Sequence, residues 1–300
     1  MGRVTCNHSV LRLGPQGAQR RSDPVAVEEP LEIRINGESF LVTMRTPGDD
    51  IDLVHGLLHS EGLIREAADI RLARYCAGSG PDGVNTYNVL DISLADGVPA
   101  PIAAARRSVV TTSACGICGA TSIDQVLRQS RYAFSQDLRV PAALIRSAPL
   151  LLRGQQRAFA KTGGLHAAGL LSVDGTMRCV REDVGRHNAV DKVVGWALRQ
   201  GRLPLAEIIL VVSGRASYEL TQKAVLAGIP VLVAVSAPSS LAIDLAAHAG
   251  LTLLGFVRGE SMNVYTHPQR ILPDLPRPDN PDATIQRTKG RAGVSDGYDT

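Results

Sequence analysis

The distribution of apolar and polar residues along this chain changes once, near residue 142. From there to about residue 257, short runs of Val, Ile and Leu alternate with longer segments whose apolar residues recur every three or four positions. The first pattern predicts buried strands and the second predicts helices. In chain order the predicted elements are helix 142–157, strands 167–173 and 177–182, helix 188–199, strand 208–212, helix 219–227, strand 231–235, helix 241–249 and strand 251–257. Continuous apolar strands alternating with helices indicate an α/β domain with a mostly parallel sheet flanked by helices.

Before residue 142 the strands are shorter and predict a smaller α+β domain. The predicted elements are strands 31–35 and 40–44, a helix over 49–64 and strand-like sequence around 87–94. The first two strands meet at Asn36-Gly37, a dipeptide that favours a tight hairpin turn. Asp49 or Asp50 is the predicted helix cap, since both follow a Pro-Gly turn. We therefore place an N-terminal α+β domain at residues 28–120 and the α/β domain at residues 121–267.

Both ends of the chain are predicted to be disordered. Residues 1–22 contain four arginines and no acidic residue, and we expect a disordered leader over residues 1–27. From residue 268 the chain becomes rich in proline and then in polar residues and glycine, a composition typical of disorder. Residues 268–300 are therefore expected to form a Pro-rich disordered tail.

Composition restricts the classes of partner. A chain of 300 residues with 44% hydrophobic residues can bury a large core. A net charge of +3 and 4% aromatic residues argue against a nucleic-acid partner. No apolar run reaches the roughly 18 residues of a membrane span, and five unevenly spaced cysteines do not suggest a disulfide scaffold. We expect a cytoplasmic protein with no membrane partner.

The strongest candidate for chemistry is Cys115-Gly-Ile-Cys118, which places two thiols three residues apart beside flexible glycines. Residues 107–112 are rich in β-branched side chains and predict a strand, whereas residues 121–128 predict a helix with a hydroxyl cap at its start. The pair is then expected before the positive end of a helix dipole, which lowers a thiol pKa and favours the reactive thiolate.

Two plainer interpretations of this pair stay open: a structural zinc half-site, or two ordinary buried cysteines. Zinc needs about four ligands, usually including a second closely spaced pair. Cys6, Cys76 and Cys179 are isolated in the sequence, and no histidine pair has zinc-finger spacing. The sequence therefore argues against zinc.

Three loops are predicted at the carboxyl ends of the later strands, where α/β sheets usually bind ligands. They are residues 213–217, 236–240 and 258–261. The first two combine small residues and hydroxyls with a following helix N-terminus, which suits phosphate or another anion. Arg215 and Arg258 strengthen this prediction because guanidinium groups pair with phosphate in bidentate fashion. The plainer interpretation is that the hydroxyls only cap helices.

Two further polar features have structural interpretations. His166 invites comparison with the H-x-E signature of zinc deaminases, but Ala168 stands where the catalytic glutamate is needed and the C-x-x-C pair lies upstream. We interpret His166 as a hydrogen-bonded structural histidine. Residues 181–192 hold an unusual density of ionisable groups, whose plain interpretation is a solvated strand-to-helix loop in which Asp183 caps the helix or pairs with Arg186.

Several motifs occur together in a fixed order. They are Arg45-Thr-Pro-Gly-Asp-Asp50, Glu61-Gly-Leu-Ile64, Cys115-Gly-Ile-Cys118-Gly119, Thr162-Gly-Gly-Leu-His166-Ala167, Arg181-Glu-Asp-Val-Gly-Arg-His-Asn-Ala-Val-Asp-Lys192, Ser213-Gly-Arg215, Gly255-Phe-Val-Arg-Gly259 and Asn263-Val-Tyr-Thr266. With this set, the core from about residue 31 to 266 resembles the formate dehydrogenase accessory sulfurtransferase family, also called FdhD/NarQ. The leader and the tail lie outside the resemblance.

The resemblance implies a sulfur carrier protein, a sulfurtransferase that takes sulfur from a cysteine desulfurase as a cysteine persulfide. It passes this sulfur to the molybdenum (or tungsten) bis-guanine-dinucleotide cofactor that formate dehydrogenase requires. The resemblance also implies a homodimer and a cytidine-deaminase-like fold for the C-terminal half, without the deaminase zinc.

Carried over to this sequence, the resemblance makes Cys115 the persulfide carrier and Cys118 its partner. The loop that corresponds to the family's nucleotide-cofactor site is Phe256, Val257, Arg258, Gly259, Glu260 and Ser261, and the strand-end argument adds Ser213 and Arg215. Ser261 departs from the family, where this position is often basic.

Two other functions remain open from the residues. In a thiol-disulfide oxidoreductase, Cys115 would attack and Cys118 would resolve the mixed disulfide. A cofactor chaperone would hold the nucleotide without any sulfur chemistry of its own.

Overall fold

The computed structural model describes residues 3–76, 87–100 and 119–274. The elements, in chain order, are β1 (Thr5–Gly14), β2 (Gly17–Ala26), β3 (Glu29–Ile35), β4 (Glu38–Arg45), α1 (Asp50–Ser60), η1 (Ala67–Asp69), β5 (Ile70–Tyr75), β6 (Val89–Leu94), α3 (Gly119–Gln129), β7 (Val140–Pro141), α4 (Ala142–Gln155), α5 (Arg157–Thr162), β8 (His166–Ser172), β9 (Met177–Asp183), α6 (Arg186–Arg199), β10 (Ile208–Val212), α7 (Tyr218–Leu226), β11 (Val231–Ala234), α8 (Ser240–Ala249), β12 (Thr252–Arg258), β13 (Ser261–Val264), η2 (Pro268–Arg270) and β14 (Ile271–Leu272). Within these ranges no helix is both long enough and apolar enough to cross a bilayer.

The large sheet has six strands in the order β13-β12-β11-β10-β8-β9. The expectation of a mostly parallel sheet is wrong, because only β10, β11 and β12 run parallel to one another. β8, β9 and β13 each pair in antiparallel fashion. The reason is the length of the connections: residues 173–176 and 259–260 are too short for the crossover that parallel strands require. The fold is a mixed α/β fold.

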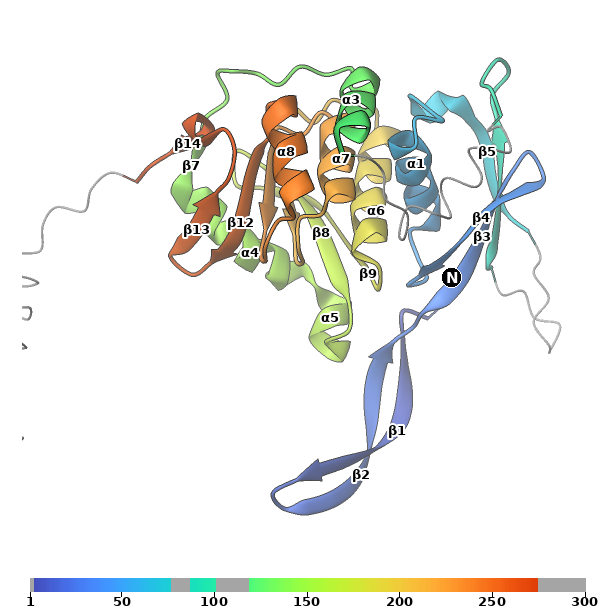
Figure 1. Cartoon of the computed structure of the whole chain (residues 1–300). Helices are drawn as coiled ribbons and strands as arrows, with labels where there is room; N and C mark the ends of the chain where they lie inside the picture. The colour runs from blue at the N-terminus through green and yellow to red at the C-terminus, as the bar shows by residue number, and fades with distance from the viewer. Residues whose placement is uncertain (1–2, 77–86, 101–118, 275–300) are drawn as a thin grey trace, which may run out of the picture.

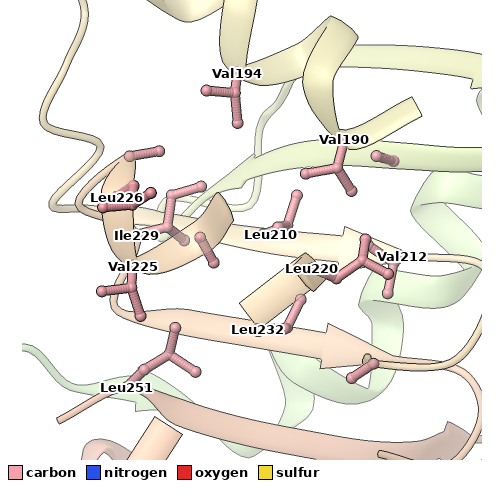
Figure 2. Packing of buried hydrophobic residues seen from close by; sticks show 14 of the residues in the cluster. Val190, Val194, Leu210, Val212, Leu220, Val225, Leu226, Ile229, Leu232 and Leu251 are labelled. Atoms are coloured by element: carbon pink, nitrogen blue, oxygen red, sulfur yellow. The ribbon is translucent and has the colours of Figure 1, made fainter. Parts of the chain in front are cut away.

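Helices cover both faces of this sheet. α6, α7 and α8 lie on one face and α4 crosses the other (Figure 1). Figure 2 shows the core under the first face, where Val190 and Val194 of α6 and Leu220 of α7 face strand residues such as Leu210 and Leu232. Every residue of β11 is buried and so is nearly all of β10, which explains why these strands are continuous apolar runs.

The small sheet has the order β4-β3-β6-β5 and packs against α1. The predicted hairpin is confirmed: Ile35 pairs with Glu38, and Asn36 and Gly37 between them have φ of 52° and 83°, as a two-residue turn requires. α1 ends at Ser60 rather than at residue 64, because the chain turns at Gly62 with φ of 73°.

The leader is not disordered. β1 and β2 form an antiparallel hairpin from Thr5↔Ala26 to Gly14↔Gly17, which projects from the body of the molecule (Figure 1). Its side chains are mostly exposed, so the backbone ladder forms with little apolar burial. Residue composition indicates which segments bury apolar side chains, so it does not predict a hairpin whose side chains are mostly exposed.

The expectation of disorder from residue 268 onward is wrong for residues 268–274. η2 and β14 follow residue 267, and β14 pairs with β7. Arg270 is 1% exposed and donates to the carbonyl oxygen of Gly250 and to Thr252 Oγ1. These contacts attach residues 268–274 to the α/β domain, and the rest of the tail lies outside the described residues.

Candidate functional site

A pocket of about 640 Å³ opens at the carboxyl ends of the strands of the large sheet. β9, β10, β11 and β12 contribute the residues at or just beyond their ends: Val184, Ser213, Val235 and Val257. The other walls are α4, the start of α5 and the loop that leads into β8 at His166. We call it the strand-end pocket. Its position follows the rule for α/β sheets, since the loops at these strand ends leave a crevice.

The lining of the strand-end pocket is basic. Arg146, Arg153 and Arg258 line it, and among the described residues no carboxylate does. Arg146 lies 2.6 Å from Asp274 and 3.7 Å from Glu260. The Arg153 guanidinium carbon lies 4.1 Å from the centre of the Phe159 ring, and Arg258 is exposed at the end of β12. Guanidinium groups arranged in this way can bind phosphate oxygens in bidentate fashion.

The backbone that carries Arg258 has an unusual conformation. Phe256 has φ of 53° although it is not a glycine, and its N–H donates to the Ser236 carbonyl oxygen at 3.2 Å. The pairing of β12 with β13 shifts register between Gly255 and Arg258. A side chain on Gly255 would meet Pro238 Cδ at 2.9 Å. Left-handed backbone costs on the order of 1–3 kcal/mol and is enriched at ligand sites. In this chain it comes directly before Val257, Arg258 and Gly259, which line the pocket.

His166 faces the same pocket. Within the described residues its side chain makes no hydrogen bond, and its interpretation as a hydrogen-bonded structural histidine stays a prediction. The imidazole lies against Gly214, where a Cβ would be 3.4 Å from Nδ1. Burial, followed by the charges of Arg186 and His187, lowers its pKa. A neutral imidazole therefore lines the pocket, with nitrogens able to donate or accept a hydrogen bond.

The described residues around the strand ends contain no group of three or more His, Cys, Asp or Glu side chains placed to hold a metal ion. Cys115 and Cys118 lie outside the described residues. α3 begins at Gly119, directly after Cys118, which is two residues earlier than predicted. The predicted hydroxyl cap is therefore inside the helix. The expectation of a protein without zinc stays a prediction.

Comparison with known proteins identifies the family. The sequence model of the FdhD/NarQ family matches residues 26–272. The chain belongs to the FdhD/NarQ family. A protein of Nocardia farcinica named sulfur carrier protein FdhD is 59% identical over 271 residues, covering 90% of this chain and 96% of the relative. A protein of Streptomyces coelicolor with the same name is 55% identical over 273 residues, covering 90% and 97%.

A solved structure supports the same assignment. It is the crystal structure of a protein from Desulfotalea psychrophila that was provisionally assigned as a formate dehydrogenase accessory protein. It is 28% identical in sequence, covers 90% of this chain and 100% of its own, and superposes with a TM-score of 0.69. The mixed α/β fold is therefore the fold of this FdhD/NarQ relative.

The structure places the predicted cofactor residues of this FdhD/NarQ protein in two groups. Ser213, Val257, Arg258 and Gly259 line the strand-end pocket. The others do not, and they are Phe256, Glu260, Ser261 and Arg215. Among the latter, the Ser261 hydroxyl donates to the Arg258 carbonyl oxygen at 3.3 Å, and Arg215 is exposed outside the pocket.

The hydroxyl loops are partly engaged in local structure. Ser213 Oγ accepts a hydrogen bond from the N–H of Ala167 at 2.9 Å. Ser239 caps α8 by accepting from the N–H of Ala242 at 3.3 Å. The plainer interpretation of the 236–240 loop as a helix cap therefore holds for Ser239.

Among the lining residues that the sequence did not predict, Arg146, Arg153 and Phe159 carry the polar and aromatic contacts. Helix 142–157 was predicted to cover the sheet, and its basic residues were not assigned a role. A signal was present, because Arg146 and Arg153 are seven residues apart and residues two turns apart share one face of a helix. Two arginines on one face beside a strand-end loop point to an anion site.

Three charged residues of the cluster 181–192 are buried rather than solvated, namely Asp183, Asp191 and Lys192, and its other polar residues are half-buried. Asp183 is fully buried, with Lys192 Nζ at 2.7 Å from its carboxylate and the N–H of Thr46 donating to it at 3.2 Å. In the same region Lys223 Nζ lies 2.7 Å from Asp191. We call these groups the buried charge layer, which lies between α1, α6 and α7 and consists of Arg45, Asp50, Asp183, Asp191, Lys192 and Lys223. Its charges form three ion pairs. Hydrogen bonds from the N–H of Thr46 to Asp183 and from the Ser60 hydroxyl to Asp191 connect the layer to the part of the chain that carries the small sheet.

Proposed function

We propose that this FdhD/NarQ protein is a sulfur carrier that takes sulfur from a cysteine desulfurase as a persulfide on Cys115. It passes the sulfur to the molybdenum (or tungsten) bis-guanine-dinucleotide cofactor that formate dehydrogenase needs. Relatives more than 50% identical are named sulfur carrier protein FdhD. The observation that carries the proposal in this chain is the strand-end pocket, whose described lining has three arginines and no carboxylate.

The strand-end pocket suits one nucleotide arm of such a cofactor. Its volume of about 640 Å³ lies within the range of roughly 300–1,000 Å³ typical of small-molecule sites. Arg146, Arg153 and Arg258 supply charge for a diphosphate, and His166 supplies a neutral polar contact. A cofactor with two guanine dinucleotides needs two such pockets, so we propose a homodimer. We also propose a cytoplasmic location.

The sulfur step is a displacement at sulfur. The Cys115 thiolate attacks the terminal sulfur of the desulfurase persulfide, the S–S bond of that persulfide breaks, and the desulfurase cysteine leaves as a thiolate. Cys115 then carries the sulfane sulfur. On delivery, Cys115 leaves as a thiolate and the sulfur bonds to the metal, whose two-electron oxidation makes it a sulfide ligand. Since α3 begins just after Cys118, its N-terminal partial charge favours the thiolate form of a nearby cysteine.

Intact mass after incubation with a cysteine desulfurase and cysteine tests the sulfur step. We expect the protein to gain one sulfur atom that a reducing agent removes, and the variant Cys115→Ala to gain none. Cys118→Ala should keep at least part of the loading, whereas a thiol-disulfide oxidoreductase would lose its activity without the resolving thiol. Absence of the adduct on Cys115 would sink the carrier proposal and leave the cofactor chaperone.

Guanosine diphosphate binding tests the pocket. Arg258→Ala should weaken the binding of this nucleotide by about tenfold or more, since a charge-assisted hydrogen bond contributes roughly 1.5–3 kcal/mol. Persulfide loading on Cys115 should be unchanged in the same variant. Equal nucleotide affinity in wild type and variant refutes the assignment of Arg258.

The cytidine-deaminase-like description of the C-terminal domain is part of the same proposal. It is supported by the strand order β9-β8-β10-β11-β12, in which the first two strands form a hairpin and each later strand follows a helix. Superposition of residues 142–258 on a solved deaminase tests it, and a different order of the matched strands counts against it.

A further inference from the structure

A second pocket lies on the side of the large sheet where the central parallel strands begin, away from the strand-end pocket. It has a volume of about 290 Å³ and is lined by the end of α1, the turn that follows it, the end of α3 and Leu226 of α7. Tyr132 in its wall packs on Gly228, where a Cβ would lie 3.0 Å from the ring. Gly228 leads into the amino end of β11, so the two pockets are separate. We call the second one the arginine pocket.

Three guanidinium groups line the arginine pocket, those of Arg65, Arg128 and Arg131. Its described lining contains no carboxylate. Throughout residues 3–76, 87–100 and 119–274, none of the three side chains has an ion pair or a side-chain hydrogen bond. Positive charges gathered around one small volume repel each other, and an anion between them removes that repulsion.

His59, in the last turn of α1, adds a neutral polar group. The residue is 8% exposed and its Nδ1 atom is buried without a partner in the described part of the chain. Burial, with the charges of Arg131 and Lys223, lowers its pKa to about 4. The imidazole is therefore neutral at pH 7. Buried polar atoms in proteins nearly always have a partner, and an anion in this pocket would give Nδ1 an acceptor in the tautomer that carries its proton there.

Helix dipoles do not explain the cluster. Arg128 is in the last turn of α3, where a basic side chain complements the negative partial charge. Arg65 and Arg131 lie outside any helix. The turn after α1 and the end of α3 are in ordinary contact across the pocket wall, since a Cβ on Gly62 would lie 3.5 Å from the Gln129 side chain. The three arginines are exposed around the buried His59, and within the described residues their guanidinium donors are unused.

We propose that the arginine pocket binds a tetrahedral oxyanion of phosphate size, either free phosphate or the phosphate monoester group of a larger molecule. Guanidinium forks match the oxygen pairs of such anions, and a dianion suits three positive charges better than a carboxylate does. The volume lies just under the roughly 300–1,000 Å³ typical of small-molecule sites, so it admits this group rather than a whole dinucleotide. The proposal is independent of the sulfur-carrier function.

Protection from an arginine-specific reagent tests it site by site. The full-length protein is treated with phenylglyoxal in chloride, in inorganic phosphate or in glycerol 3-phosphate, all at equal ionic strength, and modification is scored by peptide mass. We expect phosphate to slow modification of Arg65, Arg128 and Arg131 by about tenfold and to leave the hairpin residues Arg12 and Arg20 unaffected. Stronger protection by the ester assigns the site to a larger molecule, and protection by phosphate alone assigns it to the free ion.

Calorimetric titration with phosphate gives the affinity. Replacing both Arg128 and Arg131 by Gln should raise the dissociation constant of this site at least about tenfold, with the circular dichroism spectrum unchanged. The matched control Arg12→Gln changes another exposed arginine, outside the pocket, and should bind as wild type does. Equal modification of the pocket arginines in chloride, phosphate and ester, or unchanged affinity in the double variant, overturns the proposal.

Discussion

The buried charge layer and the strand-end pocket both gather charged side chains, but the layer pairs its charges inside the protein and the pocket leaves guanidinium groups free to bind a ligand. In the layer, Arg45 and Lys192 are 1% exposed and each contacts a carboxylate at 3.0 Å or less. In the pocket, Arg153 and Arg258 are exposed and have no carboxylate partner within the described residues. Arg146 is the exception, because it pairs with Asp274 at 2.6 Å. The density of ionisable residues in a motif therefore does not distinguish a scaffold from a site. The presence of partners inside the protein does.

The energetics of the two regions differ for the same reason. Removing one partner of a buried pair leaves an uncompensated charge, which is strongly destabilising. Asp191 illustrates this, since burial raises its pKa while the facing Lys223 ammonium opposes that rise. Exposed pocket arginines can change at little cost in stability. Mutations in the layer should thus act on folding, and mutations in the pocket on binding.

The largest effect is expected at the helix crossing beside the layer. Gly195 of α6 lies against α1 so closely that an added Cβ would overlap the Asp52 carbonyl oxygen and the Gly56 nitrogen. These are backbone atoms and cannot move aside. We expect Gly195→Ala to lower the free energy of unfolding by more than about 4 kcal/mol, measured by urea denaturation.

Gly154→Ala is the matched control for that change. Gly154 is also in a helix, but an added Cβ would meet nothing within 4 Å, so alanine should stabilise by up to about 1 kcal/mol. If the two variants have similar stability, the close crossing of α1 and α6 is not what holds the two sheets together.

The next largest effect is expected from breaking one buried pair. Lys192→Met leaves the Asp183 carboxylate buried without its cation and should lower the free energy of unfolding by about 3–5 kcal/mol. The double variant Asp183→Asn with Lys192→Met should recover part of this loss. Arg178→Met breaks the exposed pair with Asp174 and should cost less than about 1 kcal/mol. A loss at Lys192 no greater than at Arg178 contradicts the role assigned to the layer.

The features that could be predicted from the sequence are those that depend on residues close together in the chain. The turn at Asn36-Gly37 depends on two residues that tolerate positive φ, and the strands around Leu210 and Leu232 depend on continuous burial. Both predictions are confirmed. α4 was also predicted, although the chain breaks it at Gln156 and starts a second short helix.

What the sequence missed depends on partners distant in the chain. Asp183 is buried because Thr46, 137 residues earlier, donates to it, and no local pattern shows that. The β1–β2 hairpin buries little apolar area, so hydrophobic periodicity carries no signal for it. Arg146 and Arg153 share a helix face, but only the fold brings that face to the strand ends. The rule that α/β sheets bind ligands at the carboxyl ends of their strands therefore predicted the loop residues of the pocket and not its helical wall.

A smaller effect is expected at His59, beside the layer, and it depends on pH. Its pKa is lowered from 6.5 to about 4 in the folded protein, so between these values the unfolded chain binds a proton that the native state does not. Stability should therefore fall as the pH is lowered from about 6.5 to 4, by roughly 3 kcal/mol from this group. His59→Gln should lose less over that range in urea denaturation. His248→Gln, at an exposed helix position, should follow the wild-type curve, and identical curves for all three proteins contradict the assignment.

The smallest effect on stability is expected in the strand-end pocket, at Arg153. Its guanidinium lies over the Phe159 ring, an exposed contact that contributes about 0.5–1 kcal/mol, so Arg153→Gln should change the free energy of unfolding by no more than this. The same variant should bind guanosine diphosphate about tenfold more weakly in calorimetric titration. Arg157→Gln removes an equal charge at the first residue of α5, which is exposed and not part of the pocket lining, and should bind as wild type does. If both variants weaken binding equally, the nucleotide responds to the general positive field and not to the pocket, and the contrast between paired layer and unpaired pocket loses its functional meaning.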